Sequence, residues 1–172
     1  MVLRLTSFLF CLFVLVGCQS TKTVSTDKGS AKKEMSEKKK ILFGRTYIDA
    51  SKEKVLENYE KASTLYQQAL SIDPSNAAAH YELGLTYEKL GQINQAFEQF
   101  QMAAELEPSN YWYQLSYATF LQSQNKIDES ITIFEELAKQ NPQKLELKYE
   151  LAKLLLNNNR VKEGINYLNL IK

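Results

Sequence analysis

Residues 77–110 read AAAHYELGLTYEKLGQINQAFEQFQMAAELEPSN, and the apolar residues of this stretch recur at helical spacing. The positions that follow a three-to-four-residue period, rather than the alternation of a strand, are Leu83, Leu90, Ala96, Phe100 and Ala103. Gly91 lies between the two apolar runs, where a tight turn needs a positive φ angle. The stretch therefore predicts two helices joined by a short turn.

The three prolines of the chain are 34 residues apart, at Pro74, Pro108 and Pro142. Aligning the sequence on this period gives three repeating columns. The first holds only small residues: Ala50, Gly84, Ala118 and Ala152. The second is also small: Ala62, Ala96, Ser130 and Gly164. The third is large and mostly aromatic: Tyr66, Phe100, Phe134 and Leu168. Small residues let the two helices of a unit approach closely, and the large residues fill the space between units.

These columns resemble the tetratricopeptide repeat (TPR), a helix-turn-helix unit of 34 residues. The stretch quoted above carries, in the family's order, Leu83, Gly84, Tyr87, Gly91, Ala96, Phe100, Ala103 and Pro108. The resemblance covers residues 43–172, or about 3.8 units, divided as 43–76, 77–110, 111–144 and the incomplete 145–172. It implies an all-α fold, a right-handed α-solenoid of TPR units.

The links between helices carry their own signals. Gly91, Asn125 and Asn159 share the turn inside a unit, whereas the first unit has Glu57 at this place. The links between units, 73–76 and 107–110, offer Ser or Asn as a cap for the next helix. The opening helix is expected from Phe43 to Glu57.

The fourth unit is expected to end at Lys172, inside its second helix. Leu168, Leu170 and Ile171 would then leave apolar surface uncovered at an end where solenoids usually carry a polar cap. Either a partner covers this end, or the sequence is the amino-terminal piece of a longer protein; we favour the second interpretation.

Residues 1–17 differ from the repeat in composition. A single basic residue, Arg4, precedes an apolar run that is shorter than the roughly 20 residues a spanning helix needs. This pattern is typical of a secretory signal peptide. The following Leu15-Val16-Gly17-Cys18 resembles the lipobox of bacterial lipoproteins. That resemblance implies cleavage before Cys18, a diacylglycerol on its thiol and an acylated (palmitate-bearing) amino terminus; the alternative is an ordinary thiol behind an ordinary signal.

Gln19 follows the cysteine, where Asp would resemble an inner-membrane retention signal. The resemblance therefore favours the outer membrane of a bacterial cell envelope. Residues 18–40 hold seven Lys against three acidic residues, with no aromatic residue. Such a segment predicts a flexible basic tether, which is either a solvated linker or is attracted to anionic lipid headgroups.

The first helix of each TPR unit lines the concave side of the stack, where family members hold a peptide or helix. Mapping the family's groove-facing positions onto this sequence predicts a groove made by Tyr47, Tyr81, Leu85, Trp112, Leu115, Thr119, Tyr149 and Lys153. The alternative for several of them, Tyr81 and Tyr149 above all, is packing between neighbouring first helices. Trp112 is the best single candidate, because no repeat column demands Trp there. The Lys, Asn and Arg pattern of carboxylate-clamp co-chaperones is not present.

Other classes of function have weaker support. The repeat region has 13 Lys and Arg against 17 Asp and Glu, which disfavours nucleic-acid binding. His80, the only histidine, lies next to no nucleophile arrangement, and no metal-ligand spacing or phosphate-binding loop occurs. We therefore expect no catalytic site, metal, cofactor or small-molecule substrate.

The leading hypothesis is a non-enzymatic, membrane-anchored TPR scaffold for protein–protein interactions in a bacterial envelope complex. The alternative is the docking arm of a longer envelope enzyme or sensor, whose catalytic domain lies beyond residue 172.

Overall fold

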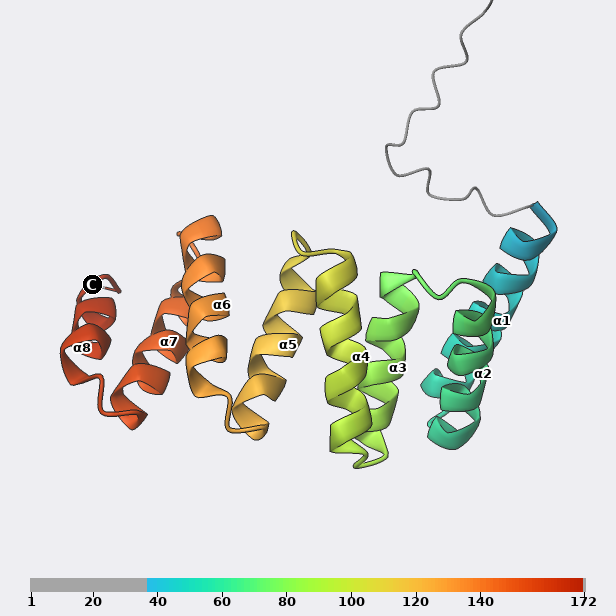
Figure 1. Cartoon of the computed structure of the whole chain (residues 1–172), viewed down its shortest axis with the longest axis horizontal. Coiled ribbons are helices and arrows are strands. Elements are labelled where there is room, and N and C mark those ends of the chain that lie inside the picture. Colours follow the sequence, from blue (N-terminus) through green and yellow to red (C-terminus); the bar gives the residue numbers. More distant parts are fainter. Residues whose placement is uncertain (1–36, 172) are drawn as a thin grey trace, which may run out of the picture. The chain divides into compact units, whose positions relative to one another are not determined.

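A computed structural model describes residues 37–171. These residues form eight helices in chain order (Figure 1). Their bounds are α1 Glu37–Val55, α2 Tyr59–Ile72, α3 Ala77–Lys89, α4 Ile93–Leu106, α5 Tyr111–Ser123, α6 Ile127–Gln140, α7 Leu145–Asn157 and α8 Val161–Asn169. No strand occurs within this range. The predicted all-α solenoid of paired helices is confirmed.

Each helix packs mainly against its neighbours in the chain. Figure 1 shows the helices side by side in sequence order, so that α1 and α2 form the first pair and α7 and α8 the fourth. The interface inside a pair uses the small columns: Ala50, Ala62, Ala96, Ala118, Ala152 and Ser130 are all fully buried. At Gly84 of the first column even a Cβ atom would be crowded, because it would lie 2.9 Å from Cε1 of Phe100.

The large column fills the space between units, as expected. Phe100 of α4 is fully buried and contacts Tyr81 of α3 and Phe120 of α5, with ring centroids 5.6 and 4.7 Å apart. Phe134 of α6 is also buried. Leu168 of α8 is the exception, since 36 % of its surface is exposed. In each earlier unit, the equivalent residue packs against the first helix of the following unit.

The turns inside the units have the predicted positive φ angles. Gly91 has φ of 70°, Asn125 of 57° and Asn159 of 62°. Glu57 adopts the same conformation, with φ of 61°. A residue with a Cβ atom pays about 1–2 kcal/mol for this left-handed backbone. The first unit therefore keeps the turn geometry in spite of its sequence.

Asparagine caps begin two of the first helices. The side chain of Asn76 accepts a hydrogen bond from the backbone N–H of Ala79 at 2.9 Å, and Asn110 accepts one from Trp112 at 3.1 Å. At the start of α7 the equivalent residue is Lys144, whose side chain forms no such bond.

The helix ends differ from the sequence prediction at both ends of the repeat. Helix α1 begins at Glu37, not Phe43, so the last four residues of the predicted tether 18–40 are helical. An ion pair between Lys40 and Glu37 at 3.1 Å, with Glu37 in the first turn, stabilises this start. Helix α1 ends at Val55, and α8 ends at Asn169, before the expected Lys172.

The predicted signal peptide, Cys18 and the tether up to residue 36 lie outside the described residues. Within residues 37–171, no helix combines the length and the apolar character that crossing a membrane requires.

Candidate functional site

A groove of about 470 Å³ lies between α5 and α7, the first helices of the third and fourth units. Its lining residues come from α5, α6 and α7: Tyr111, Leu115, Thr119, Gln122, Phe134, Glu146, Leu147, Glu150 and Lys153. Three of the eight predicted groove residues, Leu115, Thr119 and Lys153, are among them.

The groove has an apolar floor. Leu147 and Phe134 are buried, and Leu115 is half-buried against the same core cluster. The hydroxyl of Thr119 donates to the carbonyl oxygen of Leu115 at 2.8 Å, which turns its polar atom toward its own helix. This floor can accept an apolar side chain at little desolvation cost.

The α7 wall carries the charges of the groove. Lys153 Nζ lies 2.6 Å from Glu150 Oε2, and this hydrogen bond raises the pKa of Lys153. Glu146 lies one turn earlier and is 4.0 Å from Lys144. The α5 wall, in contrast, presents only neutral side chains. The two sides of the groove therefore differ in charge.

Tyr111 forms the edge of the groove at the start of α5. The Lys144 ammonium lies over its ring, 4.7 Å from the centroid. Burial raises the pKa of Tyr111, and the nearby Glu146 carboxylate raises it further. The phenol thus stays neutral and offers a hydrogen-bond donor next to the charged wall.

Three other predicted residues, Tyr47, Tyr81 and Leu85, lie against the core of the first units. Tyr47 packs edge-on against Tyr66 at 5.6 Å, and Tyr81 contacts Tyr113 at 4.9 Å. Leu85 packs on the same cluster. Their positions match the packing alternative.

Trp112 and Tyr149 are surface residues outside the groove lining. Their exposed fractions are 60 % and 55 %. The Trp112 ring packs edge-on against Tyr111 at 5.0 Å, so it lies next to the groove edge without lining it. Trp112 is therefore not a core residue.

The eight predicted groove residues do not include the other six lining residues: Tyr111, Gln122, Phe134, Glu146, Leu147 and Glu150. Glu146 and Glu150 lie on the same helix as Lys153, and their spacing was a usable signal. Phe134 and Leu147 are themselves buried, so only the sizes of the side chains opposite them reveal a groove.

The buried side-chain nitrogen and oxygen atoms within residues 37–171 all have hydrogen-bond partners. The His80 ring pairs with the Gln99 amide at 2.8 Å and with the carbonyl oxygen of Pro74 at 3.0 Å. These contacts join α3 to α4 and to the preceding link. No group of three or more metal-ligating side chains occurs in the described part of the chain.

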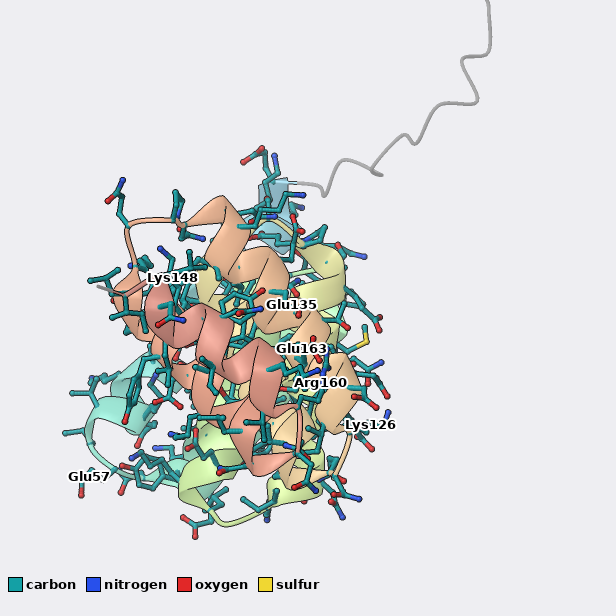
Figure 2. All side chains as sticks on the ribbon, turned by 90° about the vertical axis from the view of Figure 1, so that its left-hand side faces the viewer. Glu57, Lys126, Glu135, Lys148, Arg160 and Glu163 are labelled. Atoms are coloured by element: carbon teal, nitrogen blue, oxygen red, sulfur yellow. The ribbon has the colours of Figure 1, made fainter. Side chains whose placement is uncertain are left out.

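A second polar cluster lies at the α8 end of the repeat. Arg160 forms two hydrogen bonds with Glu163, at 2.9 and 2.6 Å, and lies 3.8 Å from Asp128 of α6. Figure 2 shows Arg160, Glu163 and Glu135 close together on this face. These exposed ion pairs connect α6 with the start of α8 and contribute little to stability.

Comparison with known proteins agrees with the repeat architecture. A model described as TPR repeat matches residues 56–91, and two described as tetratricopeptide repeat match residues 77–110 and 121–172. No curated protein matches the sequence.

One solved structure with a similar fold is that of MamA (residues 41 to the end) from Desulfovibrio magneticus RS-1, with a TM-score of 0.65. The two sequences are 14 % identical, and the match covers 75 % of this chain and 73 % of that chain. YrrB, described as a TPR protein with an unusual peptide-binding site, has a TM-score of 0.66 and 20 % identity over 78 % and 72 % of the two chains. The matched family models together cover more than half of the sequence. They agree with the 34-residue columns and with the helix pairs. The chain therefore belongs to the tetratricopeptide repeat family.

Proposed function

We propose that this protein is a membrane-anchored TPR scaffold, which holds a segment of a partner protein in the groove between α5 and α7. The observation that carries the proposal is the groove itself. It combines an apolar floor with charged groups on one wall only. Such a site suits a peptide with an apolar anchor and a few polar contacts that fix its register.

Family and neighbours support a binding role rather than a catalytic one. TPR units commonly hold peptides or helices, and the structurally similar YrrB is described as having a peptide-binding site. The groove lining contains no Ser, Cys or His, and its carboxylates face an open surface. We therefore propose that it binds without chemical conversion.

The membrane anchor is proposed from the sequence. Leu15-Val16-Gly17-Cys18 supports lipidation of Cys18, and Gln19 supports an outer-membrane destination in a bacterial envelope. Acyl chains at one end and a basic tether would hold the repeat near the membrane surface.

The binding role is tested with Leu115→Tyr. Tyr occupies the same column at Tyr47, Tyr81 and Tyr149, so the fold is expected to accept the larger side chain while the groove becomes filled. Affinity capture from envelope extracts is expected to recover a partner with the wild type and to lose it with Leu115→Tyr. Gln95→Tyr, on the exposed face of α4, is the matched control and is expected to keep the partner. Equal capture by Leu115→Tyr would place the binding surface elsewhere.

The anchor is tested by mass spectrometry of the membrane fraction. The mature amino-terminal peptide is expected to begin at an acylated Cys18, and Cys18→Ser is expected to remain unprocessed or unlipidated. A mature wild-type peptide with a free Cys18 thiol would end the lipoprotein proposal.

A further inference from the structure

The repeat allows the groove to be compared with the equivalent places in the earlier units. Between α1 and α3, the ammonium of Lys54 hydrogen-bonds to the carboxylate of Glu82, and both side chains are about three-quarters buried. Advancing this pair by two units of 34 residues gives Gln122 and Glu150. Glu150 thus has the position of Glu82, but the preceding unit offers it a neutral amide instead of a cation.

Glu150 finds its cation on its own helix instead. Its partner Lys153 is three residues away, and about half of each side chain is exposed. Exposed pairs of this kind are weak and exchange partners readily. A second cation, approaching from the groove, can therefore bind the Glu150 carboxylate from the side where Lys54 binds Glu82.

The apolar part of the groove also results from a difference between equivalent residues of successive units. Between α3 and α5, the rings of Tyr81 and Tyr113 meet at 4.9 Å and fill the space between the helices. The equivalent residues one unit later are Leu115 and Leu147. Both line the groove, and neither carries a ring. Replacing two tyrosines by two leucines leaves room for one large apolar side chain.

We propose that the groove recognises a peptide segment in which a large apolar or aromatic residue is followed closely by Lys or Arg. The proposal rests on the peptide-binding function proposed above and specifies its ligand. The apolar side chain lies on the groove floor next to Leu115, and the basic group bonds to Glu150. Glu146, on the same wall, adds attraction for the cation and repels acidic segments.

The spacing follows from the α7 helix. Leu147 and Glu150 are three residues apart, which is about 4.5 Å along the helix axis. In an extended peptide, the residues that point to the same side are i and i+2, about 6.6–6.8 Å apart. The long side chain of Lys or Arg covers the difference. We therefore expect the apolar and basic residues at positions i and i+2.

The test uses synthetic decapeptides with Phe at a fixed position and Lys, Gln or Glu two residues later, the other positions being Gly and Ser. Binding to the full chain is measured by fluorescence anisotropy. Affinity is expected to fall from Lys to Gln to Glu, by about two- to fivefold at each step, as for a partly exposed ion pair. Replacing Phe by Ala is expected to abolish binding.

Two variants assign the charge preference to α7. Glu150→Gln is expected to make the Lys and Gln peptides bind equally. Lys153→Gln is expected to do the opposite and strengthen binding of the Lys peptide, because Glu150 loses its competing partner. Glu98→Gln, on the exposed face of α4, is the control and is expected to change nothing.

The outcomes separate this inference from the function on which it rests. Equal affinity for the three peptides, a preference for Glu, or no binding of any peptide at 1 mM overturns the inference. If partner capture still depends on Leu115, the proposed function survives that result. If Leu115→Tyr leaves partner capture unchanged, the proposed function fails as well.

Discussion

Gly84 is a position where the addition of one methyl group disturbs the helix packing. In Gly84→Ala, the new Cβ atom would lie 2.9 Å from Cε1 and 3.0 Å from Cδ1 of Phe100. Carbon atoms normally pack at about 3.5–4.0 Å. The ring cannot move away freely, because it is fully buried and contacts Tyr81 and Phe120. Overpacking of this kind costs about 1–3 kcal/mol.

Gly44 provides the matched control. It also lies within a helix, α1, but a Cβ atom there would meet nothing within 4 Å. Replacing Gly by Ala in a helix gains about 0.5–1 kcal/mol from backbone entropy. Gly44→Ala is therefore expected to stabilise the protein by that amount. Gly84→Ala has the same gain but also the overpacking cost, for a net loss of about 1 kcal/mol.

Urea unfolding, followed by the helical circular dichroism signal, measures both variants. The expected difference between them in the free energy of unfolding is about 2 kcal/mol, with opposite signs relative to the wild type. If Gly84→Ala is as stable as Gly44→Ala, the close contact between α3 and Phe100 does not exist and the assigned register of the repeat is wrong.

Further predictions follow from single residues. Glu57→Gly is expected to raise the free energy of unfolding by about 0.5–1 kcal/mol. The substitution relieves the strain of the left-handed backbone at this residue, but it also increases the conformational entropy of the unfolded chain. An unchanged urea midpoint would contradict the positive φ angle. Ala96→Leu, at a fully buried small position, is expected to cost about 1–3 kcal/mol in the same assay. Trp112→Ala is expected to change stability by less than about 0.5 kcal/mol because the side chain is mostly exposed, and a large drop in melting temperature would make it a core residue. Burial raises the pKa of Tyr66 from 10.0 to about 12, so between these pH values the unfolded chain loses a proton that the folded chain keeps. The free energy of unfolding is therefore expected to fall as pH rises from 10 to about 12, and to fall less in Tyr66→Phe. Parallel pH profiles of the wild type and Tyr66→Phe would contradict the pKa shift.

Much of the fold was predictable because it depends on local spacing. The small columns and the turn residues recur every 34 positions, so the same pattern predicts the same helix pair in each unit. Ser or Asn was expected as a cap in the links 73–76 and 107–110, and Asn76 and Asn110 accept hydrogen bonds of this kind. Even the backbone of Glu57 follows from its column, since the three equivalent residues are Gly or Asn.

The helix ends were less predictable. Residues 37–40 are Glu and Lys, and this start of the helix is stabilised by a favourable ion pair rather than by burial. Composition alone therefore suggested a flexible segment up to residue 40. The structure shows that helix α1 starts at Glu37, within that segment.

The groove was only partly predictable. Of the residues that the columns predicted, Leu115, Thr119 and Lys153 line this groove. Whether such a position packs or stays accessible depends on the side chain from the next unit. Tyr81 meets Tyr113, whereas Leu115 lies opposite another leucine, Leu147. This difference appears only when residues of adjacent units are compared as pairs.

The central claim is that a partner segment binds between α5 and α7. Site-specific photocrosslinking in living cells that express the protein tests this most directly, with a benzophenone side chain placed at Thr119 inside the groove or at Glu98 on the exposed face of α4. We predict a discrete crosslinked partner from position 119, none from position 98, and loss of the product when Leu115→Tyr is added. A product from position 98 alone, or one from position 119 that persists in Leu115→Tyr, would contradict the claim.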